Sequence, residues 1–132
     1  MQKNFDSWNK TKKVIHTSGN SPFYKEREIW WCSIGVNVGF EQDGTGKNFD
    51  RPVLIIKGFN RNVFLGLALT SRQKTGKYYF HIGQVEGEEN WAILSQIRLI
   101  DTKRLVRKVM TLEYQIFTRL KQVLVQTVFG DK

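Results

Sequence analysis

Short apolar runs separated by polar breaks constrain the fold of this chain more than any other feature of its sequence. Each run is rich in β-branched and aromatic residues, and glycine, asparagine or proline stands between the runs, which is the pattern of β-strands joined by turns. Strands this short, at this spacing, favour a small barrel or two packed sheets. The predicted strands are residues 28–34, 52–59, 62–70, 77–84, 91–100 (bent near 95–96) and 106–110.

Helices are predicted on either side of the β-rich segment. Residues 4–16 place apolar side chains at helical spacing, and Asn4 or Asp6 can cap this helix. After the last strand, Thr111 can cap a second helix, whose apolar stripe repeats every 3.6 residues. We therefore expect a mainly β (α+β) protein with a helix at each end.

The chain has 132 residues and a formal net charge of +9 at pH 7. This length suits one domain, which we place at residues 26–132, with residues 1–25 as a helical extension packed on it. The positive charge favours a polyanionic partner, with nucleic acid ahead of a membrane surface, although a basic protein without such a partner has the same composition. Residues 51–80 carry six basic side chains and no acid.

The sequence indicates a cytoplasmic protein that neither spans nor binds a membrane. No apolar run approaches the roughly 20 residues of a membrane-spanning helix, and the N-terminal residues lack the apolar segment of a signal peptide. The single cysteine, Cys32, cannot form an internal disulfide, and a buried strand thiol is a more ordinary interpretation than a nucleophile. No His/Cys/Asp cluster has metal-ligand spacing, so we expect no metal or other cofactor.

A polar loop at residues 41–52 joins two of the predicted strands. It carries Glu41 near its entry and Arg51 at its exit, directly before a proline. A second, basic loop follows at residues 71–77. Loops on a rigid sheet are where binding and catalytic groups tend to lie, so these two loops predict a site for a phosphate-bearing substrate.

Three segments, in this order, resemble the MazF/PemK toxins of type II toxin–antitoxin modules. They are Glu-Gln-x-Gly followed by Arg-Pro-Val-Leu-Ile-Ile, the strand end Leu-Thr-Ser at residues 69–71, and Ser-Gln-Ile-Arg-Leu-Ile-Asp-x-Lys-Arg-Leu at residues 95–105 before a helix. The resemblance covers about residues 26–126. It implies a small SH3-like β-barrel with a C-terminal helix, acting as a homodimer.

The resemblance also implies a reaction and a protein partner. Members of this family are metal-independent endoribonucleases that cut single-stranded RNA, such as mRNA, at short sequences. The 2′-hydroxyl attacks the adjacent phosphate and leaves a cyclic phosphate and a 5′-hydroxyl. A cognate antitoxin fills the RNA groove. The loop at residues 41–51 is longer than is usual in the family, which bears on the target sequence more than on the reaction. The N-terminal helix is extra and can shield a surface that other members leave open.

By the resemblance, Arg51 matches the catalytic arginine of the family, and Thr70 matches its threonine at the end of the third strand. A guanidinium stays charged and binds two phosphate oxygens, so we expect Arg51 to stabilise the transition state, with proton transfer left open. Thr70 can donate to a phosphate oxygen, helped by Ser71, and Glu41 is expected to position Arg51. A strand-end salt bridge of Arg51 to Asp50 or Glu41 and turn capping by Thr70 are the structural alternatives.

Single-stranded RNA is held by charge and by base stacking, so basic and aromatic residues near Thr70 are candidate contacts. Each aromatic candidate has core packing as its alternative. His81, in the middle of a strand, is better explained as a surface or packed residue than as a catalytic base. The predicted RNA-binding residues are Phe40, Gln42, Asn48, Phe49, Arg72, Lys74, Lys77 and Tyr79.

Two other functions fit a barrel of this kind. One is a protein-binding toxin similar to the gyrase poison CcdB, which needs no catalytic arginine. The other is an RNA-binding barrel without activity, which only an assay distinguishes. Arg51, Thr70 and the basic loop favour RNA cleavage over the first alternative.

Overall fold

The computed structural model describes residues 3–18, 21–35, 37, 43–45 and 49–130. Strands hold more of these residues than helices do, with a helix before the first strand and a helix after the last. The elements are α1 (Phe5–Ser18), β1 (Glu28–Ser33), β2 (Asp50–Gly58), β3 (Val63–Thr70), β4 (Tyr79–Val85), β5 (Glu88–Asp101), the 3-10 helix η1 (Thr102–Arg104), β6 (Leu105–Thr111) and α2 (Tyr114–Phe129).

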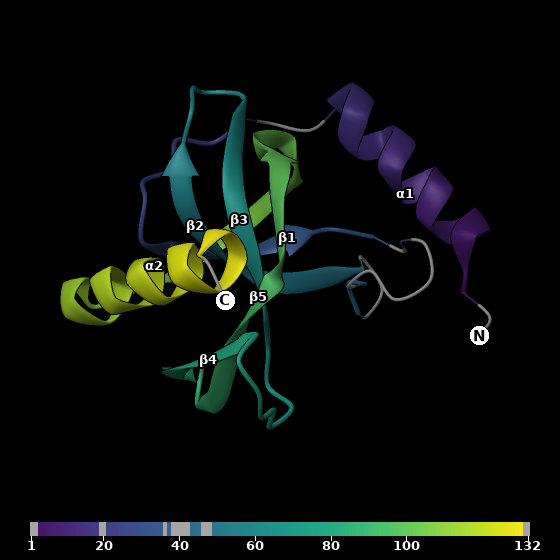
Figure 1. Ribbon diagram of the computed structural model, residues 1–132. Coiled ribbons are helices and arrows are strands. Elements are labelled where there is room, and N and C mark those ends of the chain that lie inside the picture. Colours follow the sequence, from purple (N-terminus) through teal and green to yellow (C-terminus); the bar gives the residue numbers. More distant parts are fainter. Residues whose placement is uncertain (1–2, 19–20, 36, 38–42, 46–48, 131–132) are drawn as a thin grey trace.

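All six strands belong to one antiparallel sheet in the order β4-β5-β3-β2-β1-β6. Strand β5 is 14 residues long and pairs with both β4 and β3. Its register against β3 shifts between Leu67 and Leu69, opposite the predicted bend at residues 95–96. The sheet curls into a half-barrel (Figure 1). The predicted mainly β class with a helix at each end is therefore confirmed, and the alternative of two packed sheets is wrong.

The central strands are buried on both faces, which explains their uninterrupted apolar runs. In β2, Leu54 and Ile56 belong to one apolar cluster, whereas Val53 and Ile55 belong to another on the opposite face. Successive side chains of a strand point to opposite faces. A strand that is covered on both sides therefore needs an apolar residue at every position, as residues 53–56 provide.

Helix α2 covers the first of these clusters. Its buried side chains are Phe117, Leu120 and Leu124, and they pack with Leu54 and Leu67 of the sheet. The apolar stripe that the sequence predicted is confirmed. Burying three large apolar side chains stabilises the helix far more than its own propensity does, at about 1.5–3 kcal/mol for each.

The predicted cap of this helix, Thr111, is wrong. Thr111 is the last residue of β6, and α2 begins at Tyr114, after an N-cap residue, Glu113, that makes no side-chain capping bond. The reason lies in the sheet. The backbone N–H of Leu112 donates to the carbonyl of Arg27 at 2.8 Å, which keeps the chain extended beyond the end of β6.

The connection between β4 and β5 is shorter than the gap between the predicted strands at residues 77–84 and 91–100. Only Glu86 and Gly87 turn the chain between β4 and β5, and Glu88 already begins β5. Both turn residues have positive φ, at 50° and 82°, as a two-residue hairpin of the I′ type requires. Glu88 and Glu89 pair with β4 because a turn this tight brings the two strands together at once.

Helix α1, predicted at residues 4–16, is confirmed at Phe5–Ser18, and it lies beside the sheet on a different side from α2 (Figure 1). Asn4 caps it, because the backbone N–H of Ser7 donates to Asn4 Oδ1 at 3.1 Å. Trp8 anchors it and is 5 % exposed. The division of the chain into an extension (1–25) and a barrel domain (26–132) stays a prediction. No described helix is both long enough and apolar enough to cross a membrane.

Gly35 permits Trp8 to pack where it does. Its φ is +81°, and a Cβ at this position would lie 2.0 Å from Cε2 of Trp8. Gly87 has nearly the same φ, +82°, but a Cβ there would meet no atom within 4 Å. The two glycines therefore differ in the space around them rather than in backbone conformation.

This difference gives a matched test of how α1 docks. Gly87→Ala should lower the free energy of unfolding by about 1–2 kcal/mol, the cost of a left-handed backbone for a non-glycine residue. Gly35→Ala should cost about 1–3 kcal/mol more, because the methyl group also displaces Trp8. Urea denaturation followed by tryptophan fluorescence measures both values. Equal losses would contradict the docking of Trp8 against Gly35.

Candidate functional site

A groove of about 1090 Å³ opens at the end of the sheet where β2 begins and β3 ends. These strands are antiparallel neighbours, so the start of one lies beside the end of the other. The groove collects most of the site residues that the sequence predicted within the described part of the chain. Those that line it are Arg51, Thr70, Ser71, Arg72, Lys74 and Tyr79.

Arg51 is held by backbone carbonyls. Its Nε donates to the carbonyl of Asp43 at 2.6 Å, and its Nη1 donates to the carbonyl of Leu69 at 3.1 Å. Burial lowers the pKa of the Arg51 guanidinium, with Asp43 opposing this shift and Arg72 adding to it. An arginine guanidinium is not deprotonated in proteins at neutral pH, so Arg51 keeps its charge. The two carbonyls fix the plane of this charge at the groove.

Thr70 shapes the beginning of the basic loop. The residue is only 6 % exposed, and its Oγ1 accepts a hydrogen bond from the backbone N–H of Arg72 at 3.2 Å. The capping role that the sequence left as an alternative is thus present in the structure. It does not exclude a second role, because a hydroxyl that accepts one hydrogen bond still has its proton to donate. Ser71 beside it is exposed.

Arg72 and Lys74 give the groove a cationic rim, and both side chains are exposed. The ammonium of Lys74 lies 5.9 Å from the ring centroid of Tyr79, which also lines the groove. A cation beside a half-exposed ring can contact a phosphate while the ring stacks on a base. These positions follow from the sequence, because the basic loop directly follows β3.

Two predicted contacts lie elsewhere, and four lie outside the described residues. The ring of Phe49 packs edge-on against Trp8, with centroids 5.6 Å apart. The ammonium of Lys77 lies over the ring of Tyr78, at 5.1 Å. Neither Phe49 nor Lys77 lines the groove. The residues outside the described part of the chain are Phe40, Glu41, Gln42 and Asn48.

Trp31 also lines the groove, and the sequence treated it only as part of an apolar run. Its Nε1 donates to Glu86 at 3.2 Å, and Glu86 pairs with Arg107 at 2.7 Å. The guanidinium of Arg107 lies 5.8 Å from the Trp31 ring centroid. Hydrogen bonds from Arg107 and Trp31 lower the pKa of Glu86. Strand alternation could have found Trp31, because its neighbours Trp30 and Cys32 both point into one core cluster.

The other chemically tempting residues do not reach the groove. Cys32 is fully buried, and burial raises the pKa of its thiol, which keeps it neutral. His81 is exposed, and its Nε2 lies 2.6 Å from Glu89 while its ring packs on Trp91. Both agree with the structural interpretations that the sequence favoured. Within the described ranges, no three His, Cys, Asp or Glu side chains gather as metal ligands.

The groove therefore combines a fixed guanidinium, a hydroxyl and a cationic rim. Glu86 and Glu88 of the β4–β5 hairpin also line the groove. Such an arrangement suits an extended anion that also carries groups able to donate hydrogen bonds to carboxylates. A phosphodiester chain with exposed bases has this chemistry.

Comparison with known proteins agrees with this arrangement. The model of a protein family described as PemK-like, MazF-like toxin of type II toxin–antitoxin system matches residues 25–128. No curated protein matches the chain.

Solved structures share the fold at low sequence identity. MazF from Deinococcus radiodurans has 15 % identity and a TM-score of 0.66, over 81 % of this chain and 97 % of that one. An endoribonuclease from a mycobacterial species has 12 % identity and a TM-score of 0.59, over 84 % and 94 %. Another mycobacterial endoribonuclease, in complex with its cognate antitoxin, has 11 % identity and a TM-score of 0.61, over 83 % and 99 %.

Proposed function

The chain belongs to the PemK-like, MazF-like toxin family of type II toxin–antitoxin systems, and from this premise we propose that it is an endoribonuclease that cuts single-stranded RNA in the groove. One observation carries the proposal. Arg51 stands at the groove with its guanidinium fixed by two backbone carbonyls, beside the hydroxyl-bearing Thr70 and the cationic Arg72. A preorganised charge of this kind is what a phosphoryl-transfer transition state needs.

In the proposed reaction the RNA supplies its own nucleophile. The 2′-oxygen forms a bond to the adjacent phosphorus, its proton passes to a base, and the bond to the 5′-oxygen breaks. The products are a 2′,3′-cyclic phosphate and a 5′-hydroxyl that has gained a proton. Arg51 stabilises the negative charge on the pentacoordinate phosphorus, and Thr70 donates a hydrogen bond to one of its oxygens.

No metal takes part in this proposal. The protein brings a permanent cation to the phosphate, which is the service that a metal ion performs in other nucleases. The group that accepts the 2′-proton is left open, and Glu41 stays a candidate from the sequence for positioning Arg51. Burial lowers the pKa of Arg51, but a guanidinium is not deprotonated in proteins at neutral pH, so stabilisation of charge stays its main proposed role.

The rim residues Arg72 and Lys74 are proposed to bind phosphates on either side of the cut, and Tyr79 and Trp31 to stack on bases. Phe40, Gln42 and Asn48 stay candidate RNA contacts on the loop at residues 41–52. We further propose that the protein is cytoplasmic and acts as a homodimer. A segment of its cognate antitoxin inhibits it by binding in the same groove. Arg51 and Thr70 at this groove favour RNA cleavage over a gyrase-poison role, and an assay distinguishes cleavage from RNA binding without activity.

Activity should persist in EDTA, because the proposed chemistry uses the side chains of the protein alone. The purified protein is incubated with a long RNA in excess EDTA, and the ends of the fragments are mapped. We expect 5′-hydroxyl ends, which polynucleotide kinase labels without prior phosphatase treatment. A strict requirement for a divalent ion, or 5′-phosphate ends, would overturn the proposed mechanism.

Arg51→Ala should lower the cleavage rate by roughly a hundredfold or more, as loss of one preorganised stabiliser typically does. Arg51→Lys should also cleave RNA slowly, because an ammonium cannot bind two phosphate oxygens at once as the planar guanidinium does. Thr70→Ala should cause a smaller loss, and Thr70→Ser should retain activity. The matched control is Arg61→Ala, which removes an exposed arginine from the hairpin at the other end of the same two strands. Equal rates for Arg51→Ala and Arg61→Ala would remove Arg51 from the site.

RNA and the antitoxin should compete for the groove, because both bring negative charge to one cationic rim. Binding of labelled RNA to the Arg51→Ala protein is measured with increasing antitoxin and at several salt concentrations. The binding of both ligands should weaken as salt rises, that of RNA more steeply, and joint replacement of the rim residues Arg72 and Lys74 by alanine should weaken both. Independent, simultaneous binding would show that inhibition acts at another surface.

A further inference from the structure

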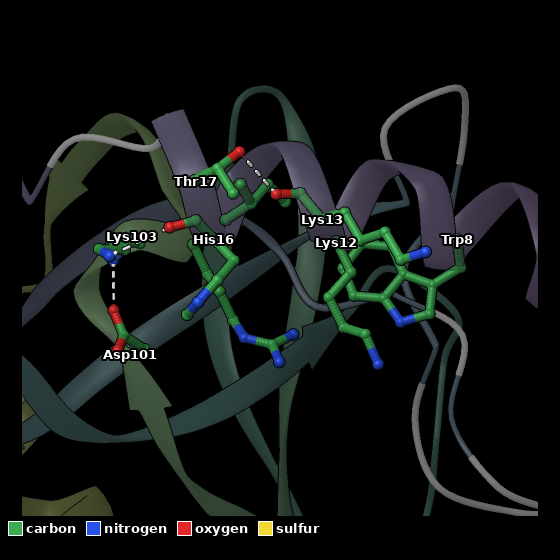
Figure 2. Close-up of a pocket in the computed structure, with 9 residues that line it drawn as sticks. Trp8, Lys12, Lys13, His16, Thr17, Asp101 and Lys103 are labelled. Atoms are coloured by element: carbon green, nitrogen blue, oxygen red, sulfur yellow. Dashed lines mark hydrogen bonds between the residues drawn. The ribbon is translucent and has the colours of Figure 1, made fainter.

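Helix α1 lies outside the residues that the family model matches, 25–128, yet it is fixed to the barrel along its length. Near its C-terminal end, Nζ of Lys103 donates to the carbonyl of His16 at 3.2 Å (Figure 2). Near its N-terminal end, the ring of the buried Trp8 lies against Arg104, whose guanidinium is 5.7 Å from the ring centroid. These contacts set the direction of the helix and so determine where the residues before it lie.

The segment before α1 ends at the groove. Lys3 lines the groove, and only 8 % of its side chain is exposed. Its Nζ lies 2.9 Å and 3.1 Å from the two carboxylate oxygens of Asp43 and donates to the carbonyl of Asn37 at 2.6 Å. Asp43 Oδ1 in turn accepts from the backbone N–H of Asn37 at 2.7 Å. Lys3 thus joins two parts of the chain between β1 and β2.

Asp43 connects this junction to the proposed catalytic arginine. Its carbonyl accepts from Arg51 Nε at 2.6 Å, so the placement of Asp43 decides the placement of the guanidinium. Its carboxylate is also a negative charge at a groove that is proposed to bind phosphates. Without a cation beside it, this carboxylate would repel the substrate and compete with it for Arg51.

We propose that Lys3 is a positioning residue for RNA cleavage, supplied by the N-terminal extension. Lys3 fixes the carbonyl that orients Arg51 and neutralises the carboxylate of Asp43 where the RNA phosphates bind. The proposal rests on the proposed endoribonuclease function and adds a residue from outside the family-matched segment to the site. Lys3 does not need to touch the reacting atoms for this role.

The two effects of Lys3 predict a defined kinetic pattern. Lys3→Ala should lower kcat, because Arg51 loses its fixed orientation, and should raise KM, because the Asp43 carboxylate is exposed to the substrate. We expect kcat/KM to fall by about tenfold, which lies within the range of interaction energies measured for residues in direct contact. Lys3→Arg keeps the ion pair and should restore most of the activity. A role in stability alone would lower the unfolding temperature of Lys3→Ala and leave kcat and KM of the folded protein unchanged.

Asp43→Asn provides the second arm of a double-mutant cycle. This variant keeps the backbone carbonyl that orients Arg51 but removes the charge that Lys3 neutralises. In the Asp43→Asn background, Lys3→Ala should therefore lower kcat/KM by less than about threefold. The same tenfold loss in both backgrounds would show that Lys3 acts without Asp43 and would overturn the proposal.

The control is Lys10→Ala, which removes an exposed lysine of helix α1 and therefore the same unit of charge. All variants carry their affinity tag at the C-terminal end, so that the segment before Lys3 is unchanged, and thermal unfolding confirms that each is folded. If Lys3→Ala cleaves RNA as Lys10→Ala does, the positioning role is wrong while the proposed function stands. If the unsubstituted protein does not cleave RNA, both the proposed function and the role of Lys3 fall.

Discussion

Burial of β2 and β3 on both faces is the constraint on which the rest of the structure depends. Residues 53–56 alternate between two apolar clusters, so the middle of these strands has no position for a polar side chain. Polar side chains are therefore found at the ends of β2 and β3. At one end the hairpin at residues 58–62 joins the two strands, and at the other end lie Arg51 and Thr70. The groove forms there because a rigid, apolar sheet holds its polar residues at that edge.

The charge of Arg51, at this edge of the sheet, is stabilised by hydrogen bonds to backbone carbonyls. Arg51 is partly buried, which costs solvation of the guanidinium, and the carbonyls of Asp43 and Leu69 offset that loss. The same bonds make the guanidinium a fixed feature of the site. Leu69 belongs to β3 and is therefore rigid, whereas Asp43 belongs to the segment between β1 and β2. This difference explains why a residue as distant as Lys3 can bear on the site.

Local pattern predicted the elements well and their ends less well. The strands and both helices follow from periodicity, and the bend of β5 follows from its polar residues 95–96. Thr111 was wrong as a cap because a long-range bond, from Leu112 to Arg27, extends the β6 segment. Strand β5 begins earlier than predicted because the turn at Glu86 and Gly87 is as short as a hairpin turn can be. In each case a pairing between distant strands decided the boundary.

The sequence by itself determined the mainly β fold class, the family, and the placement of Arg51, Thr70 and the basic loop at strand ends, because all of these follow from local order along the chain. Only the tertiary structure decided which side chains from elsewhere join the groove. Lys3 meets Asp43 across 40 residues, and Phe49, expected to contact RNA, packs on Trp8 instead. Such contacts depend on where α1 docks, and its docking depends on a space left by Gly35. The periodicity of the sequence does not predict that Trp8 fills the space beside Gly35.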